Sequence, residues 1–185
     1  MEKINVQNCL FHGIRDGEKK DAISILEDIF TSGSLLTHDS LRQKGIVHER
    51  EIYSHQGSNA ISICFHPHNL ELFEKFKDTC IVLKNIKPAF VKYVNVSKPS
   101  IIFNQDLLNK LKYRQFGGYK RTVDEIQILG DIPLSYMEAI GFNLEGMTLE
   151  EQKHILETLS NLLKKYQYDV PIINPNNGTC YKKNK

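Results

Sequence analysis

The spacing of apolar residues predicts two amphipathic helices, one near each end of the chain. From Lys19, apolar residues recur at three- and four-residue steps until Ser32-Gly33, which predicts a helix over residues 19–31 with one side facing the core. Thr148-Leu-Glu-Glu151 has the sequence of a capping box, in which two side chains satisfy amides of the first helical turn. Leucines then continue at helical spacing to about Tyr166. We expect this second apolar face to pack on the core or to contact a partner.

Between these helices, short apolar runs bounded by Gly, Pro and polar turns predict β-strands. The predicted strands are Cys9–Gly13, Ala60–Phe65, Cys80–Leu83, Ala89–Val94, Ser100–Phe103 and the run after Asp124. Asn69 is expected to cap a two-turn helix, and residues 104–112 to form another short helix. Residues 34–45 and the turn-rich tail from Asn174 are expected to be loose.

This order of elements favours an α+β fold. Short strands alternate with few helices and lack the regular βαβ spacing of a parallel sheet. We therefore expect two facing, antiparallel-rich sheets around a cleft, with flanking helices. A chain of 185 residues with 41% hydrophobic content can bury a sizeable core. We expect residues 1–147 to form the main domain and residues 148–185 to form an appended helix and tail.

Composition and charge exclude several function classes. A net charge of +2 gives no whole-molecule attraction to nucleic acid or anionic membranes. The longest apolar runs fall short of the roughly 18 residues that span a bilayer, and the start of the chain lacks a signal-peptide pattern. Four scattered cysteines argue against a zinc site or a disulfide framework and favour reduced thiols in a cytosolic setting. His66-Pro-His68 has the look of a metal pair, but no third ligand at helix spacing accompanies it, so we interpret it as a surface turn.

A loop and a strand with unusual composition identify Glu125 as a candidate for chemistry. Residues 113–121 combine two adjacent glycines with three aromatic and three cationic residues, which suits a mobile loop that contacts a charged or planar ligand. Strand-forming residues follow at once, so Glu125 is expected at the start of a strand. A carboxylate in that position is well placed for catalysis, although many such glutamates are ordinary solvated charges.

Two segments together resemble the ADP-ribosyltransferase superfamily. Phe11-His-Gly13, followed by a helix that ends in Ile25-Leu-Glu-Asp-Ile-Phe-Thr-Ser-Gly33, is similar to the His-Gly strand and helix of the diphtheria-toxin and poly-ADP-ribose polymerase branch. Asp124–Leu134 resembles the catalytic-glutamate strand of the DarT-type DNA ADP-ribosyltransferases. The resemblance covers roughly residues 9–142. It implies an ADP-ribosyltransferase-like fold with NAD as co-substrate and Glu125 as the catalytic residue.

The resemblance also assigns residues to NAD. It implies that His12 holds a ribose hydroxyl and that the backbone of Gly13 holds the nicotinamide amide. Family members stack a middle-strand tyrosine on nicotinamide, whereas the matching segment here has Cys64 and Phe65, with Tyr53 just upstream. Two further residues complete the predicted NAD contacts: Ser62, which matches the serine of the Arg-Ser-Glu branch, and Arg15, which is close enough to His12 to meet the pyrophosphate.

NAD cleavage passes through an oxocarbenium-like ribose, which a carboxylate such as Glu125 stabilises. The loop before it would present the acceptor through Arg114, Phe116, Tyr119, Lys120 and Arg121. The acceptor is a protein or a nucleic acid, and the near-neutral charge favours a protein. We therefore expect an ADP-ribosyltransferase, as a toxin or effector, in the cytoplasm or delivered into the cytosol of a target cell. The alternative is a non-catalytic binding module, or a relative of the RNA 2′-phosphotransferases, on the same fold.

Overall fold

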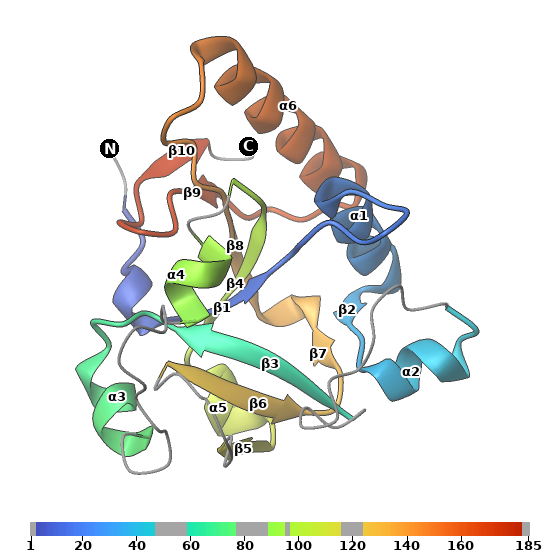
Figure 1. The fold of residues 1–185 in the computed structure, drawn as a ribbon, viewed down its shortest axis with the longest axis vertical. Coiled ribbons are helices and arrows are strands. Elements are labelled where there is room, and N and C mark those ends of the chain that lie inside the picture. The colour runs from blue at the N-terminus through green and yellow to red at the C-terminus, as the bar shows by residue number, and fades with distance from the viewer. Residues whose placement is uncertain (1–2, 47–58, 77–88, 95–96, 116–123, 183–185) are drawn as a thin grey trace.

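The computed structural model describes residues 3–46, 59–76, 89–94, 97–115 and 124–182, and most of its strands belong to one sheet (Figure 1). Along this sheet the strand order is β10-β9-β8-β4-β1-β3-β6-β5. The bounds are β1 Cys9–Gly13, β3 Ala60–Phe65, β4 Ser100–Asn104, β5 Tyr113–Gln115, β6 Glu125–Leu129, β8 Met137–Gly141, β9 Ile172–Ile173 and β10 Cys180–Lys182. Within this sheet, β8 and β9 are parallel and the other described neighbours are antiparallel. A second, small sheet pairs β2 (Ser34–Leu35) with β7 (Ile132–Pro133).

The ladder between β1 and β3 is much shorter than the ladders beside it. Two pairs join these strands, Leu10 with Phe65 and Phe11 with Cys64, whereas five pairs join β1 to β4 and five join β3 to β6. We call this two-pair ladder the seam. The large sheet thus consists of two mostly antiparallel parts that meet at the seam. The predicted mixture of helices with an antiparallel-rich sheet is confirmed, while two facing sheets around a cleft remain a prediction.

Alternation along the strands separates two apolar clusters. Leu10 and Ile63 belong to the larger cluster, which also includes residues of α1 (Ala22–Ser32), α3 (Leu70–Phe76), α5 (Leu107–Lys110) and α6 (Leu149–Lys165). Phe11 and Cys64 belong to a smaller cluster on the other face, with Phe90 and Val94 of α4 (Ala89–Val94). In the part of the chain that the structure describes, no helix is long and apolar enough to cross a membrane.

Side-chain caps set the ends of both amphipathic helices. The Asp21 carboxylate accepts a hydrogen bond from the Ser24 amide at 2.7 Å, so α1 begins at Ala22, three residues after the predicted start. Gly33 ends α1 with φ of 68°, a left-handed conformation that glycine adopts without strain. The predicted capping box is confirmed at α6, where the Thr148 amide donates to Glu151 Oε2 at 2.8 Å.

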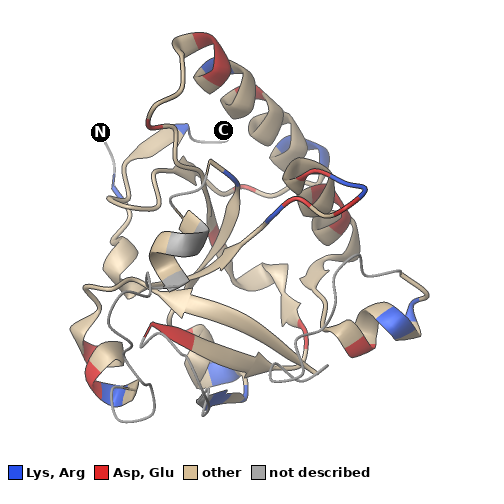
Figure 2. Ribbon diagram, viewed as in Figure 1, with Lys and Arg blue, Asp and Glu red and all other residues tan. Residues whose placement is uncertain are grey.

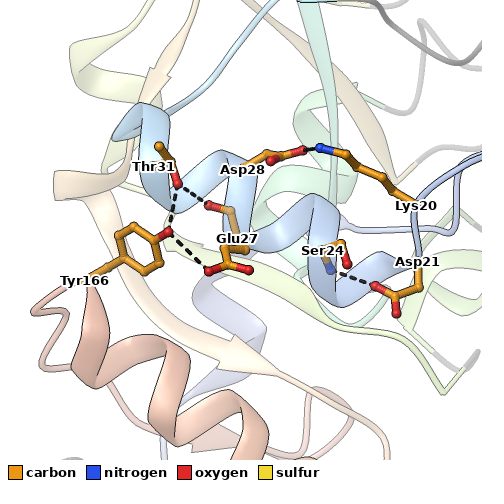
Figure 3. Close-up of polar contacts among 7 residues, drawn as sticks. All are labelled: Lys20, Asp21, Ser24, Glu27, Asp28, Thr31 and Tyr166. Atoms are coloured by element: carbon orange, nitrogen blue, oxygen red, sulfur yellow. Dashed lines mark hydrogen bonds and ion pairs between the residues drawn. The ribbon is translucent and has the colours of Figure 1, made fainter.

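Contacts between α6 and α1 attach the C-terminal region to the rest of the fold (Figure 3). The Tyr166 hydroxyl lies 2.9 Å from Thr31 Oγ1 and donates to Glu27 Oε1 at 3.3 Å, and the Tyr166 ring packs edge-on against Phe30. Lys165 pairs with Glu27 at 2.6 Å, but both side chains are well exposed, so this ion pair contributes little. The described part of the predicted appendage, residues 148–182, therefore packs on α1 and adds β9 and β10 to the sheet.

Several predicted elements differ from the structure. Ala89–Val94 forms helix α4 instead of a strand, because the first-turn amide of Phe90 finds an acceptor in the distant Asp124 carboxylate. Residues 34–45 form β2 and α2 (His38–Gln43) instead of a loose connection, with Thr37 capping α2. Tyr113–Gln115 is strand β5, which pairs with β6, and does not belong to a loop. The predicted strand at residues 80–83 lies outside the described residues.

The tail from Asn174 is also ordered, contrary to the prediction. Asn174 is 6% exposed, and its backbone bonds Thr179 and Gly178 across a tight turn that leads into β10. Gly178 sits against the start of the chain, where its carbonyl accepts a hydrogen bond from the Ile4 amide at 3.0 Å. A Cβ at Gly178 would lie closer to the Ile4 carbonyl oxygen than any contact distance allows.

We predict that Gly178→Ala destabilises the protein clearly more than Gly146→Ala. Both glycines have positive φ, 73° and 82°, so both substitutions carry a left-handed backbone cost of about 1–2 kcal/mol. Only at Gly178 does the new methyl group also meet backbone, since nothing lies within 4 Å of the Cβ position of Gly146. Urea unfolding of the two variants checks this, and equal losses of unfolding free energy would contradict the described packing of the tail on residues 3–6.

Candidate functional site

Three neighbouring strands carry the residues that the sequence singles out. His12 is the penultimate residue of β1, Ser62 lies within β3, and Glu125 is the first residue of β6, as predicted. The register places Phe11, Cys64 and Glu125 in one row across these strands. Since adjacent strands lie about 4.8 Å apart, Glu125 is roughly 10 Å from Phe11, the residue before His12. The fold therefore brings His12 and Glu125, far apart in sequence, within three adjacent strands. His12 is one residue out of the row that contains Glu125, so strand alternation starts the two side chains on opposite faces of the sheet.

The imidazole of His12 occupies the place where the β1–β3 ladder stops. Its Nδ1 lies 2.9 Å from the carbonyl oxygen of Ser62, two residues beyond Cys64, the last paired residue of β3 in the seam. A carbonyl oxygen can only accept, so Nδ1 carries the hydrogen, and Nε2 of the neutral ring is an acceptor. Burial lowers the pKa of His12 from its usual 6.5, and the bond to Ser62 opposes that effect in part. The ring is therefore neutral near pH 7, with Nε2 suited to accept a hydrogen bond from a hydroxyl group.

Glu125 is half-buried and lies directly opposite the buried Cys64. The Cys64 thiol lies 3.4 Å from the Phe11 carbonyl oxygen, to which it donates. Burial, and then the negative charges of Asp124 and Glu125, raise the pKa of this thiol well above 9.0. Cys64 therefore stays protonated and is no nucleophile. The carboxylate of Glu125 is the ionisable group of this row that remains partly exposed.

A polar row crosses the sheet two residues further along, on the same face as Glu125. Ser62, Gln127 and Arg114 lie opposite one another on β3, β6 and β5. The Arg114 Nε donates to Gln127 Oε1 at 2.8 Å, which leaves the Gln127 Nε2 as a donor. Neither this nitrogen nor the Ser62 hydroxyl has a hydrogen-bond partner among the described residues, although both atoms are buried. Buried polar atoms of this kind are uncommon and often mark a ligand or water position.

The sequence did not single out Gln127 or Asp124. The signal for Gln127 was present, because a glutamine between two isoleucines interrupts an otherwise apolar strand core. Asp124 is 4% exposed and accepts a hydrogen bond from the Phe90 amide at 2.7 Å. Nothing local predicts that bond, since it depends on where a distant segment packs. Charged residues are sparse on the strands of the sheet, and an acidic segment marks the start of β6 (Figure 2).

The remaining predicted site residues lie in varied surroundings. Gly13 ends β1 opposite Ser100, and Arg15 is half-buried just beyond it. Phe65 is fully buried and packs near Phe76, with ring centroids 6.1 Å apart, so its ring has no exposed face for nicotinamide. The predicted residues outside the described part of the chain are Tyr53, Phe116, Tyr119, Lys120 and Arg121.

The histidine pair at residues 66 and 68 forms a packed turn. The His68 amide donates to Nδ1 of His66 at 3.2 Å, and the two ring centroids are 5.2 Å apart. His66 is 6% exposed and packs against Phe90, with ring centroids 4.7 Å apart. Among the described residues, no group of three or more His, Cys, Asp or Glu side chains is arranged to hold a metal ion.

Comparisons with known proteins yield solved structures only. No protein-family model and no curated protein sequence matches the chain. Thermus sp. 2.9 DarT in complex with carba-NAD+ matches with a TM-score of 0.45 and 11% identity, over 87% of this chain and 93% of that one. The same protein in complex with ADP-ribosylated ssDNA matches with a TM-score of 0.43 and 10% identity, over 88% and 92%. Thermosipho africanus DarTG in complex with ADP-ribose matches with a TM-score of 0.41 and 13% identity, over 91% and 50%. Similarity at this level transfers no activity, ligand or site residue to the chain.

We predict that His12 makes the protein less stable in mild acid. Because its folded-state pKa lies below the ordinary 6.5, the unfolded chain binds a proton more readily, and the free energy of unfolding falls as pH drops through and below that value. His12→Gln should reduce this fall. Urea unfolding at about pH 7.5 and about pH 5.5 measures it. The control is His154→Gln on the exposed side of α6, which should show the native fall. An identical fall in His12→Gln and the native protein would contradict the described burial of the ring.

Proposed function

We propose that the chain is an NAD-dependent ADP-ribosyltransferase, which cleaves NAD, releases nicotinamide and transfers ADP-ribose to an acceptor. The observation that carries the proposal is the position of Glu125 in the row Phe11–Cys64–Glu125, across the seam from His12. Both residues lie in the segments that resemble ADP-ribosyltransferases, Phe11–Gly33 and Asp124–Leu134. Residues distant in sequence must converge in this way to pin a dinucleotide and face its glycosidic bond.

The chemistry of NAD cleavage fits these two side chains. As the bond from ribose to nicotinamide breaks, the ribose gains oxocarbenium character, which a nearby carboxylate stabilises. Glu125 would act in this way and would orient a ribose hydroxyl. The neutral His12 would accept a hydrogen bond from a ribose hydroxyl at Nε2, because Nδ1 is committed to Ser62. His12 thus binds in the ground state, whereas Glu125 acts mainly in the transition state.

Further groups near the seam are suited to the rest of the dinucleotide. The Gly13 backbone would hold the nicotinamide amide, and Arg15 would meet the pyrophosphate. The buried hydroxyl of Ser62 would find in the bound ligand the partner that it lacks among the described residues. Tyr53, upstream of β3, is the aromatic residue that remains for stacking on nicotinamide, since the Phe65 ring is enclosed by the core. The two parts of the sheet would then flank NAD in the manner of the facing sheets expected from the sequence.

The acceptor would be presented by the segment between β5 and β6. Arg114, Phe116, Tyr119, Lys120 and Arg121 are the acceptor-binding residues of this proposal. Cations and aromatic rings suit either a nucleic acid or an acidic protein surface, so both acceptor classes stay within the proposal. A role as a toxin or effector belongs to the same proposal, because transfer of ADP-ribose to an essential acceptor would arrest its function.

We predict that Glu125→Gln lowers nicotinamide release from NAD by at least about 100-fold while NAD binding stays near native, because the carboxylate acts on the developing charge. His12→Ala should instead raise the apparent KM for NAD more than it lowers kcat. Nicotinamide release and NAD titration measure the two effects. Glu138→Gln is the matched control, a half-buried glutamate on β8 that accepts a hydrogen bond from Asn104. Native-like turnover in Glu125→Gln would contradict a catalytic role for Glu125, whereas absence of nicotinamide release from the native protein would favour the non-catalytic binding module.

A second prediction separates the acceptor from NAD. Replacing Lys120 and Arg121 by Ala should reduce transfer of labelled ADP-ribose to the acceptor, while NAD hydrolysis stays near native. Single-stranded DNA, RNA and a mixture of cell proteins should be offered in parallel, with nicotinamide release measured in each. Lys153→Ala with Lys164→Ala removes the same charge from exposed positions on α6 and is the control. Equal loss of hydrolysis and transfer in the variant that lacks Lys120 and Arg121 would contradict an acceptor role.

A further inference from the structure

The residue before Glu125 is a buried carboxylate with a partner on another segment. Asp124 is 4% exposed, and its Oδ2 accepts a hydrogen bond from the Phe90 amide, in the first turn of α4, at 2.7 Å. Its backbone carbonyl accepts from the Phe65 amide at 2.8 Å, where β3 ends. A buried carboxylate is costly unless hydrogen bonds compensate it, so a short bond to an amide at the start of a helix is a strong constraint on both partners.

Phe90 connects the segment before β6 to the other side of the seam. Its amide binds Asp124, while its ring packs edge-on against Phe11 of β1, with ring centroids 5.0 Å apart. The same ring lies 4.7 Å from the His66 ring, just after β3. Helix α4 therefore contacts β1, β3 and Asp124, the residue before β6.

The seam is a weak junction, so contacts that span it, such as those of Phe90, matter for its geometry. Two residue pairs hold β1 against β3, and the next position is filled by the His12 ring instead of a backbone pair. A ladder of two pairs offers little resistance when the distance between the two parts of the sheet changes. The contacts of Phe90 span that junction on the Phe11 face, so they restrain the separation of His12 and Glu125 from outside the ladder.

We propose that Asp124 is a positioning residue for ADP-ribosyl transfer, which holds α4 across the seam and thereby fixes Glu125 relative to His12. This inference rests on the proposed function. Misplacement of a catalytic carboxylate by about 1 Å costs on the order of 100-fold in rate, so loss of this bond should affect turnover far more than global stability.

The experiment compares Asp124→Ala and Asp124→Asn with Asp131→Ala. Asp131 is a matched control because its carboxylate accepts from the Thr37 amide at 2.7 Å and from Ser40 Oγ at 2.8 Å, which also holds the start of a short helix, α2. Each variant is assayed for kcat and KM in nicotinamide release, for unfolding in urea, and for hydrogen exchange at the Phe90 amide. Asparagine keeps an acceptor oxygen for that amide, whereas alanine does not.

In Asp124→Ala we expect faster exchange at Phe90 and a fall in kcat of about 10- to 100-fold, with a smaller change in KM. Asp124→Asn should recover most of kcat, and Asp131→Ala should stay within about twofold of native despite a similar loss of stability. Native kcat in Asp124→Ala, or equal losses in Asp124→Ala and Asp131→Ala, would overturn the positioning role while leaving the proposed function intact. Absence of nicotinamide release from the native protein would overturn both.

Discussion

The two-pair ladder between β1 and β3 is the constraint around which the candidate site is organised. The five-pair ladders on both sides join β1 firmly to β4 and β3 firmly to β6, so variation in the spacing of these two strand pairs concentrates at the seam between them. The ring of His12 bonds the first carbonyl group that the ladder leaves open, that of Ser62. A histidine in this position satisfies the Ser62 carbonyl group through Nδ1 and still presents Nε2 as an acceptor. A further backbone pair would satisfy the carbonyl group but would present no such acceptor.

Two adjacent carboxylates at the start of β6 have different surroundings. Asp124 is buried and bound to a backbone amide, whereas Glu125 is half-buried beside a thiol that stays protonated. A buried, bonded carboxylate stabilises the fold, and a partly exposed one can meet a ligand. In the proposed enzyme the first would hold the second in place. The unsatisfied Ser62 hydroxyl and Gln127 amide lie two residues further along the same face, where a bound ligand would complete their hydrogen bonding.

Local sequence patterns predicted the elements that local interactions determine. The capping box of α6, the Asn69 cap of α3, strand β3 and the position of Glu125 at a strand start are all confirmed. Ala89–Val94 was predicted wrongly because its apolar residues favour a strand, while a distant carboxylate and the packing of Phe90 favour a helix. The polar row of Ser62, Gln127 and Arg114 needed the strand register, which no single segment encodes.

In the proposed enzyme, NAD binds at the seam and Nε2 of His12 accepts a hydrogen bond from it. The most direct measurement is long-range proton–nitrogen NMR of the His12 ring in Glu125→Gln, before and after addition of NAD. We expect Nδ1 to be protonated in both states, because it donates to Ser62, and the Nε2 resonance to shift on binding, because Nε2 then accepts a hydrogen bond. Saturating NAD that leaves both ring nitrogens unchanged, or a free ring protonated at Nε2 instead of Nδ1, would contradict this expectation.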